Sequence, residues 1–281
     1  MRFESLKDKV VLVTGGARGI GKGLAKDCLE QGARVVITNL NAEVGQAAAA
    51  ELSALGAVRS VRCDGTERAE VDALLDNIWR TEGGLDIAFS NAGTGGRHRA
   101  LDASLAERQA LMDTNYESAV HLAQACIPRM LASGKPAHLM FTASEHAVGL
   151  PAGNEDLGFV FYGASKHAML IFAEWLRADL RGTSVSVSLL IPGPVLTEGV
   201  SAAFAQLDQN PEDPAIRSTF SKPVEALLRA RAITTTECAS RALSGLRQGL
   251  FFIPTQPHIL DDIDRRHEEM RDAFQRMGLI A

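Results

Sequence analysis

The chain has 281 residues, of which 46% are hydrophobic and 22% are charged, and its formal net charge is -5 at pH 7. A chain of this size can bury about 73% of its extended surface, enough for one large α/β domain. The slightly acidic balance gives no electrostatic reason to expect nucleic acid or an anionic membrane as a partner. The first residues do not resemble a signal peptide, and no apolar run approaches the ~18 residues that span a bilayer. We therefore expect a cytoplasmic enzyme or binding protein.

The predicted elements alternate between strands and helices. Short apolar runs rich in β-branched residues predict strands at 10–14, 34–38, 58–62, 85–90, 138–142, 185–191 and 250–253. Helical apolar spacing predicts helices that include 24–29, 47–55, 71–79, 120–131 and 168–180. This alternation favours a doubly wound, mainly parallel sheet with helices on both faces, a three-layer αβα fold. Because no linker or repeat divides the chain, we expect residues 1–281 to form a single domain.

Three segments interrupt or extend the alternation. Residues 150–160 are rich in Gly, Pro and acidic residues and predict a loop. Residues 194–222 contain several prolines and predict a substrate loop, with a short helix near 199–207. Residues 258–281 predict a helical tail whose apolar residues share one face: Ile259, Ile263, Met270, Phe274 and Met277. This face could pack on its own subunit or on a neighbour.

A glycine-rich turn, Thr14-Gly15-Gly16-Ala17-Arg18-Gly19-Ile20-Gly21, follows the first predicted strand and opens a helix. Glycines at 15, 19 and 21 permit a tight turn and a close approach to a pyrophosphate, while the helix start supplies free N–H groups. The strand before the turn and the helix after it favour a dinucleotide site over a purely structural turn. A Walker-type phosphate loop is excluded because no Gly-Lys-Ser/Thr follows.

The end of the second strand bears on the choice of dinucleotide. Such sites often carry an acid there that binds the ribose hydroxyls, but this chain has Asn39. Asparagine does not repel a 2′-phosphate, and Arg18 in the glycine turn could neutralise one. The cofactor is therefore NADP or NAD, with NADP favoured. A solvated surface role for Arg18 is the alternative.

Tyr162-Gly163-Ala164-Ser165-Lys166 opens the predicted helix that follows the fifth strand. A spacing of four places Tyr162 and Lys166 on one helical face, where the ammonium group can stabilise a phenolate. Such a pair also occurs by chance. Here Ser144 follows the fifth strand, Asn91-Ala92-Gly93 follows the fourth, and Asn115 lies in the helical segment between them.

These motifs, in this order and together with Asp64 and Pro192-Gly193-Pro194-Val195-Leu196-Thr197, resemble those of the short-chain dehydrogenase/reductase family. The resemblance implies a Rossmann-type fold and four catalytic residues, Asn115, Ser144, Tyr162 and Lys166. It implies that the cofactor is bound by Gly15, Arg18, Gly19, Ile20, Gly21, Asn39, Asp64, Asn91, Ala92, Gly93, Tyr162, Lys166, Pro192, Gly193, Val195 and Thr197. No metal is expected, because the four cysteines are scattered without a CxxC or a nearby His.

The resemblance also implies a role for each catalytic residue. Tyr162 matches the acid/base that exchanges a proton with the alcohol oxygen, and Lys166 matches the residue that lowers the tyrosine pKa and binds the nicotinamide ribose. Ser144 matches the hydroxyl that holds the substrate oxygen. Asn115 matches the residue that supports a water-linked proton path to the lysine.

The substrate side departs from the family pattern. Tyr162 follows Ser144 by 18 positions, longer than the family's usual interval. The candidates for the substrate pocket are Glu145, His146, Leu150, Phe159 and Phe204, although His146 could instead be a loop histidine satisfied by backbone or water. Apolar walls of this kind suggest a secondary alcohol or ketone on a ring or bulky skeleton.

We therefore expect an NAD(P)-dependent oxidoreductase that interconverts a secondary alcohol and a ketone by hydride transfer. The alternative is a catalytically silent NAD(P)-sensing binding protein on the same scaffold, which needs no catalytic base. The resemblance further implies a homodimer or homotetramer formed through the helices that carry Asn115 and Tyr162. The only other expected partner is a small-molecule substrate.

Overall fold

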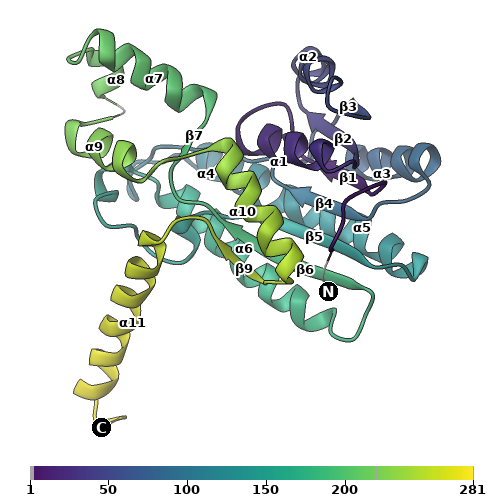
Figure 1. Ribbon diagram of the computed structural model, residues 1–281. Coiled ribbons are helices and arrows are strands. Elements are labelled where there is room, and N and C mark those ends of the chain that lie inside the picture. Colours follow the sequence, from purple (N-terminus) through teal and green to yellow (C-terminus); the bar gives the residue numbers. More distant parts are fainter. Residues whose placement is uncertain (1–2, 219, 281) are drawn as a thin grey trace.

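The computed structural model describes residues 3–218 and 220–280 and is built around a seven-stranded parallel sheet (Figure 1). The strand order is β3-β2-β1-β4-β5-β6-β9. The strands are β1 (Val10–Val13), β2 (Arg34–Asn39), β3 (Val58–Arg62), β4 (Ile87–Ser90), β5 (Ala137–Thr142), β6 (Val185–Ile191) and β9 (Phe252–Pro254). Each predicted strand is present, and the doubly wound, Rossmann-type fold is confirmed.

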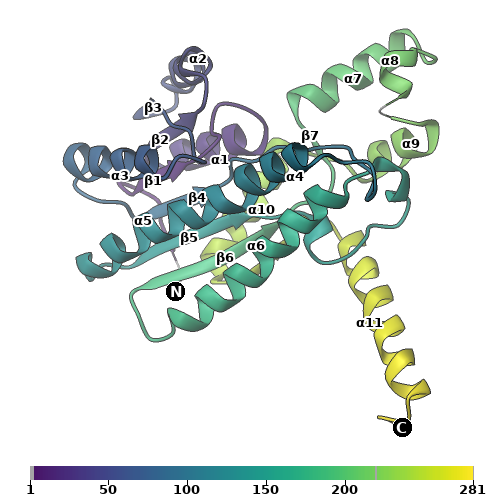
Figure 2. The ribbon, with the colours of Figure 1, turned by 180° about the vertical axis from the view of Figure 1, so that it is seen from behind.

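Two hydrophobic cores lie on the two faces of the sheet, and β1 shows how the sequence builds both. Val11 and Val13 belong to one core and Val10 and Leu12 to the other, as the two-residue period of a strand requires. Helices α1 (Gly19–Glu30), α2 (Ala42–Leu52) and α10 (Thr235–Gln248) contribute to the first core. Helices α3 (Arg68–Glu82), α5 (Ser118–Ser133) and α6 (Val160–Asp179) cover the opposite face (Figure 2).

Local signals set several helix ends. Gly83 adopts φ 81°, the left-handed conformation that ends α3. Thr234 and Glu237 form a capping box at the start of α10. Helix α4 (Leu105–Met112) was not predicted, because Leu111 is its one buried residue and the helix therefore shows no clear apolar face.

The functional edge of the sheet follows from its topology. Strand β1 pairs with both β2 and β4. The first half of the sheet therefore extends to one side of β1, and the second half, which begins with β4, extends to the other side. The loops after neighbouring strands diverge at such a switch point and leave a crevice at the carboxyl ends. The glycine turn after β1 and residues 91–93 after β4 both lie at this edge.

A smaller unit stands over that edge. Helices α7 (Glu198–Gln209), α8 (Pro214–Arg217) and α9 (Lys222–Arg231) lie together away from the main sheet (Figure 1). Strands β7 (Val195–Leu196) and β8 (Ile233–Thr234) pair in parallel at its base. The predicted short helix near 199–207 is thus present as α7, while α9 and the two short strands were not predicted.

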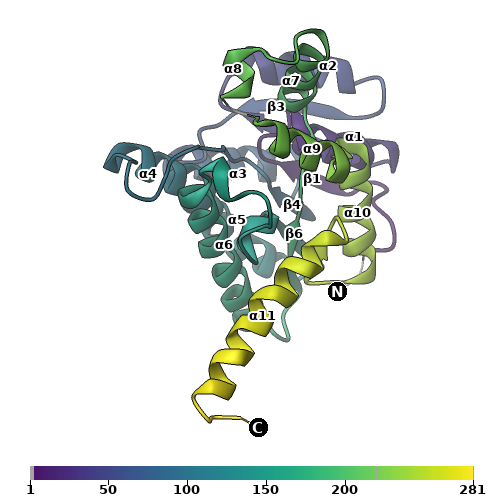
Figure 3. The ribbon, with the colours of Figure 1, turned by 90° about the vertical axis from the view of Figure 1, so that its left-hand side faces the viewer.

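Helix α11 (His258–Arg276) extends away from the rest of the molecule (Figures 1 and 3). The tail is therefore helical, as predicted. On its apolar face Ile259 is buried in the core, but Met270 is 57% and Phe274 is 47% exposed. Among the residues that the structure describes, no helix is both long and apolar enough to cross a bilayer.

Candidate active site

A cleft of about 1100 Å³ lies at the carboxyl edge of the sheet, between the glycine turn and the α7–α9 unit. Most of the residues predicted to bind the cofactor or react line it: Gly15, Arg18, Gly19, Ile20, Asn39, Asn91, Ala92, Gly93, Ser144, Tyr162, Lys166, Pro192, Gly193, Val195 and Thr197. Asp64 lines an adjoining pocket of about 450 Å³, which also touches Gly15 and Asn39. Gly21 and Asn115 do not line the cleft, but Gly21 lies against Gly15 and Asn91, and Asn115 lies against Gly93, all of which do.

The glycine turn leaves room for an anion. Gly15 and Gly19 have φ of 63° and 54°, which favour glycine, and a Cβ on Gly21 would lie 2.3 Å from the Gly15 carbonyl oxygen. The backbone N–H of Gly19, at the start of α1, donates to the Glu198 carboxylate at 2.9 Å. This carboxylate shows that the turn presents an N–H group to negative charge, so the turn fits a diphosphate.

The end of the cleft beside β2 has no acid at the tip of that strand. The Asn39 side chain donates to the backbone oxygen of Asn41 at 2.9 Å, and exposed Arg18 lines the same cleft. The Asp64 carboxylate accepts from the backbone N–H of Thr66 at 3.0 Å and from its hydroxyl at 2.7 Å. The second pocket, beside Asp64, therefore has room for a flat ring such as adenine.

Asn91 holds the central strands together. Its Nδ2 donates to the backbone oxygen of Thr14 at 3.1 Å, and its Oδ1 accepts from the Thr142 hydroxyl at 3.2 Å. These two bonds join the ends of β1 and β5 across β4. Asn91 therefore fixes the floor of the cleft from both sides.

Tyr162 and Ser144 meet in the cleft. The Ser144 hydroxyl lies near enough to the Tyr162 phenol to affect its pKa, and it accepts from the backbone N–H of His146 at 3.2 Å. Burial raises the pKa of the Tyr162 phenol, the charge of Glu145 raises it further, and the nearby Ser144 hydroxyl acts in the opposite direction. The predicted lowering of this pKa is therefore wrong for the chain alone, because burial has the larger effect.

Lys166 lies one helical turn beyond Tyr162, and its ammonium group is buried. The Nζ atom is 5.8 Å from the centre of the Tyr162 ring and donates to the backbone oxygen of Thr142 at 2.9 Å. Burial lowers the pKa of Lys166 to about 8. An ammonium group held here favours negative charge on the neighbouring phenol oxygen and carries exchangeable protons.

Asn115 lies in a single π-helical turn, η1 (Asp113–Glu117), between α4 and α5. Such turns often occur at functional sites. Its Nδ2 donates to the Thr94 backbone oxygen and to the Ser165 hydroxyl, both at 3.0 Å, and its Oδ1 accepts from the Thr94 N–H at 2.8 Å. A Cβ on Gly93 would lie 3.0 Å from Asn115 Oδ1 and 3.5 Å from Lys166 Nζ, so this glycine admits both side chains.

Comparison with known proteins gives the family. Residues 9–208 match the family model for short chain dehydrogenase. The 1-deoxy-11-beta-hydroxypentalenate dehydrogenase of Streptomyces avermitilis is 41% identical over 203 residues, which are 70% of this chain and 73% of the relative. The enzyme of the same name from Streptomyces exfoliatus is 38% identical over 203 residues, 71% of this chain and 72% of that enzyme. This chain belongs to the short-chain dehydrogenase/reductase family.

Solved structures of family members agree with the fold of this dehydrogenase. A short chain dehydrogenase/reductase from Burkholderia phymatum in complex with NAD has a TM-score of 0.81 and 28% identity, with 96% of each chain covered. The Pseudomonas aeruginosa RhlG/NADP active-site complex has a TM-score of 0.73 and 25% identity, covering 90% of this chain and 97% of RhlG. Similar structures therefore include one with NAD and one with NADP.

Three of the five residues predicted for the substrate pocket of this dehydrogenase lie in the cleft. Glu145, His146 and Phe159 line the cleft, and the His146 ring lies edge-on to Phe159 and Tyr162, with centroids 5.4 and 5.8 Å away. Burial lowers the pKa of His146 to about 4, so its ring is neutral at pH 7.

The other two predicted pocket residues lie elsewhere. Leu150 is 59% exposed and does not line the cleft, because the loop after Ser144 turns its side chain to solvent. Phe204 is buried within the α7–α9 unit, where its ring lies 6.2 Å from that of Phe220 and 4.4 Å from the Arg229 guanidinium. Both were chosen for apolar character alone, which does not distinguish a pocket wall from a loop anchor.

Sequence reasoning missed three polar residues near the site of this dehydrogenase. Gln256 and His258 follow the last strand, β9, and therefore reach the same edge of the sheet as the catalytic loops. Glu198 begins α7 and bonds the glycine turn. Their positions after strand ends could have been noticed in the sequence. Their hydrogen-bond partners could not have been, because these lie 63, 113 and 179 positions away along the chain.

Proposed function

We propose that this dehydrogenase interconverts a secondary alcohol and a ketone, with a nicotinamide dinucleotide and with Tyr162 as the acid/base. The observation that carries the proposal is that Tyr162 and Ser144 lie together in a cleft that also contains the glycine turn. Lys166 lies beneath this pair, with its Nζ 5.8 Å from the Tyr162 ring centre. A binding protein that only senses the cofactor needs the glycine turn but no acid/base such as Tyr162.

The proposed mechanism assigns one task to each side chain. A bound nicotinamide supplies the acceptor or donor of the hydride. The Ser144 hydroxyl orients the substrate oxygen, and the Tyr162 phenol oxygen takes the alcohol proton or returns it to the ketone. Lys166 stabilises the negative charge on that oxygen, while Asn115 holds the Thr94 backbone and the Ser165 hydroxyl next to the lysine.

The substrate end of the cleft is mainly apolar, with Leu157, Phe159, Val200 and Leu228 in its wall. This wall favours a ring or another bulky apolar skeleton over a small polar alcohol. The relatives from Streptomyces are named for a hydroxylated pentalenate, which agrees with that choice. The test is a panel of cyclic and aryl alcohols and ketones, with 1-deoxy-11-beta-hydroxypentalenate included.

Each member of the panel is incubated with NADP, NADPH, NAD or NADH, and the nicotinamide absorbance is followed. Turnover of at least one secondary alcohol or ketone is expected. Tight binding of a dinucleotide without turnover of any compound would instead support the cofactor-sensing alternative. Failure to bind either dinucleotide would exclude both the dehydrogenase and the cofactor-sensing protein.

We propose NADP as the preferred cofactor, because Arg18 lines the cleft near a neutral Asn39. Replacing Arg18 by alanine removes a charge-assisted bond to the 2′-phosphate and is expected to weaken NADPH binding about 10-fold or more. NADH binding should change less than 2-fold. Fluorescence titration measures both constants, and Arg80→Ala, at an exposed arginine on α3, is the control. An equal loss for both dinucleotides would exclude this role.

Glu198 is expected to oppose cofactor binding. Its carboxylate occupies the Gly19 N–H that a diphosphate needs, so the dinucleotide has to displace a negative charge. Glu198→Gln is therefore expected to tighten NADPH binding roughly 3- to 10-fold at low ionic strength, with a smaller gain at high salt. Glu212→Gln, at a carboxylate paired with Lys222 rather than with the turn, is the matched control. Weaker binding by Glu198→Gln would contradict this competition.

We also propose that the protein is a homo-oligomer, a dimer or a tetramer. The exposed apolar side chains on α11 support this proposal, since Ile263, Met270, Phe274 and Met277 continue the face that begins at buried Ile259. A second copy of the chain would remove that surface from water. Light scattering gives the molar mass, and a strictly monomeric protein at micromolar concentration would refute the proposal.

A further inference from the structure

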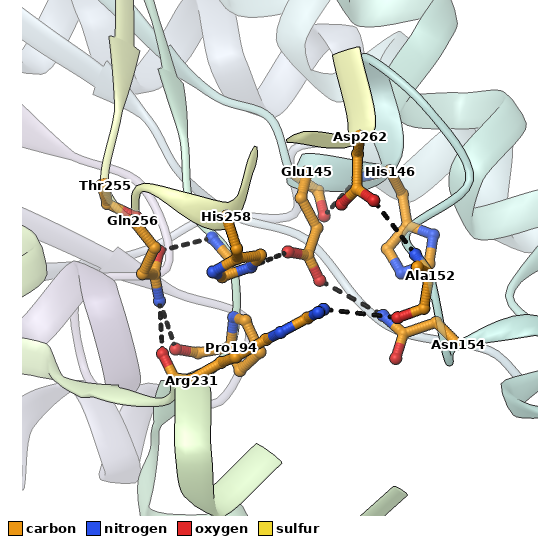
Figure 4. A network of polar contacts seen from close by, with 12 residues as sticks. Glu145, His146, Ala152, Asn154, Pro194, Arg231, Thr255, Gln256, His258 and Asp262 are labelled. Atoms are coloured by element: carbon orange, nitrogen blue, oxygen red, sulfur yellow. Dashed lines mark hydrogen bonds and ion pairs between the residues drawn. The ribbon is translucent and has the colours of Figure 1, made fainter. Parts of the chain in front are cut away.

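Three polar side chains, two of them buried and the third partly buried, connect the loops after β5 and β6 to the segment that follows β9 (Figure 4). They are Glu145, Gln256 and His258, and we call them the clasp. The catalytic roles proposed above use none of the three. Gln256 and Glu145 both bond to the 192–194 loop at the nicotinamide end of the cleft, and His258 bonds to Glu145, so we considered what they hold in place.

Gln256 fixes the loop that carries Gly193. Its Oε1 accepts from the Gly193 N–H at 2.8 Å, and its Nε2 donates to the Pro194 backbone oxygen at 2.7 Å. The same Nε2 reaches the Arg231 backbone oxygen at 3.4 Å. One amide thus satisfies a donor and an acceptor on either side of a single peptide unit, which holds both the position and the tilt of that unit.

Glu145 connects the same loop to Ser144. Its backbone N–H donates to the Pro192 oxygen at 2.8 Å, and a Cβ on Gly193 would lie 2.9 Å from its Oε2. No side chain larger than hydrogen therefore fits at position 193 without moving Glu145. The distance between the Ser144 backbone and the Gly193 backbone is set by these contacts.

His258 keeps the Glu145 carboxylate in this place. Its Nε2 lies 2.8 Å from Glu145 Oε2, and the Asn154 amide donates to Glu145 Oε1 at 3.3 Å. The other charged groups that act on Glu145 are Asp262 on α11 and Arg231 at the end of α9. Burying a carboxylate costs free energy unless it is paired, so the bond to His258 secures the arrangement.

We propose that the clasp is a set of positioning residues that fixes the 192–194 loop relative to Ser144, and so aligns the nicotinamide with the substrate oxygen. This inference rests on the proposed function, because it assigns the 192–194 loop to the nicotinamide end of a bound dinucleotide. The clasp touches neither the glycine turn nor the second pocket. It acts on one end of the cofactor only.

Because the clasp is expected to affect only the nicotinamide end of the cofactor, two ligands that differ in that end provide the test. Gln256→Ala is expected to weaken NADPH binding about 10-fold, because two hydrogen bonds to the loop are lost. Binding of 2′,5′-ADP, which contains only the adenosine end, should stay within 2-fold of wild type. The ratio of the two dissociation constants separates the clasp from a general loss of structure, which weakens both ligands alike. Gln248→Ala, at an exposed glutamine on α10, is the matched control.

His258 is tested in the same way, with a conservative variant as the rescue. His258→Ala should change the same ratio of constants, whereas His258→Gln keeps a donor toward Glu145 and should restore most of the binding. His267→Ala, at an exposed histidine on α11, should leave the ratio unchanged. If an alanine variant does not fold, as judged by circular dichroism, Gln256→Glu replaces it, since it keeps the acceptor for Gly193 and loses the donor to Pro194.

Equal changes for NADPH and 2′,5′-ADP in the Gln256 and His258 variants, or no change for either ligand, would overturn the proposal. These outcomes differ from a failure of the proposed function. If wild-type protein binds neither NADPH nor NADH, the proposed function fails before any clasp variant is made. If it binds them and the ratio is insensitive to the clasp, only the positioning role is lost.

Discussion

Replacing Tyr162 by phenylalanine is expected to lower kcat by about 10²–10⁴-fold and to leave NADPH affinity within a few-fold of wild type. The size of the loss is that of a general acid–base group in the transition state. Phenylalanine keeps the ring that contacts His146 and Phe159 but has no oxygen to exchange a proton with the substrate. Because the change removes one oxygen atom and no apolar surface, the fold and the cofactor site should remain.

Tyr116→Phe is the matched control, because Tyr116 is the other tyrosine of the chain and packs edge-on against Phe172, with centroids 6.0 Å apart. It should turn over substrate like wild type. Steady-state rates with one alcohol from the panel and a fluorescence titration of NADPH provide both measurements. Near wild-type turnover by Tyr162→Phe would show that another group carries the proton.

The strands, the glycine turn and the positions of the four residues proposed to be catalytic were predictable because each rests on a local pattern. Val10–Val13 is an unbroken β-branched and apolar run, as expected for a strand buried on both faces. Tyr162 and Lys166 are placed together by helical spacing alone. Ser144 and Asn91 follow strand ends, and parallel strands bring those ends to one edge of the sheet. None of these placements needs knowledge of a distant contact.

The remaining features depend on contacts between segments far apart in the chain. The bond between Glu145 and His258 joins residues 113 positions apart, and nothing near either residue indicates the other. The raised pKa of Tyr162 follows from its burial, and the sequence spacing between Tyr162 and Lys166 gives no information about that burial. The tail helix was predictable from its periodicity, but the exposure of Phe274 depends on the direction in which α11 leaves the sheet.

Replacing Lys166 by methionine is expected to stabilise the protein at neutral pH while lowering turnover by about 100-fold or more, because the phenolate loses its neighbouring charge. Burial lowers the pKa of Lys166 from its ordinary 10.5 to about 8 in the folded chain. The charged form therefore costs the folded state about 3 kcal/mol below pH 8. Methionine avoids this cost. It also leaves the Thr142 oxygen without its donor, and this loss reduces the gain in stability by about 1 kcal/mol.

The pH dependence decides whether this account of Lys166 is correct. Below pH 8 both the folded and the unfolded chain carry the proton, so the advantage of Lys166→Met is constant at about 2 kcal/mol. Between pH 8 and 10.5 the unfolded chain binds more protons than the folded chain, so wild type gains stability as the pH rises. The advantage of the variant should therefore shrink and then reverse.

Urea unfolding of both proteins at pH 7, 8, 9 and 10 measures this difference in stability, with Lys26→Met, at a half-exposed lysine on α1, as the control. A Lys166→Met protein less stable than wild type at pH 7, or a difference independent of pH, would show that the buried ammonium group is not destabilising. The expected result instead identifies a residue that the fold retains at a cost in stability, because the proposed chemistry needs its charge.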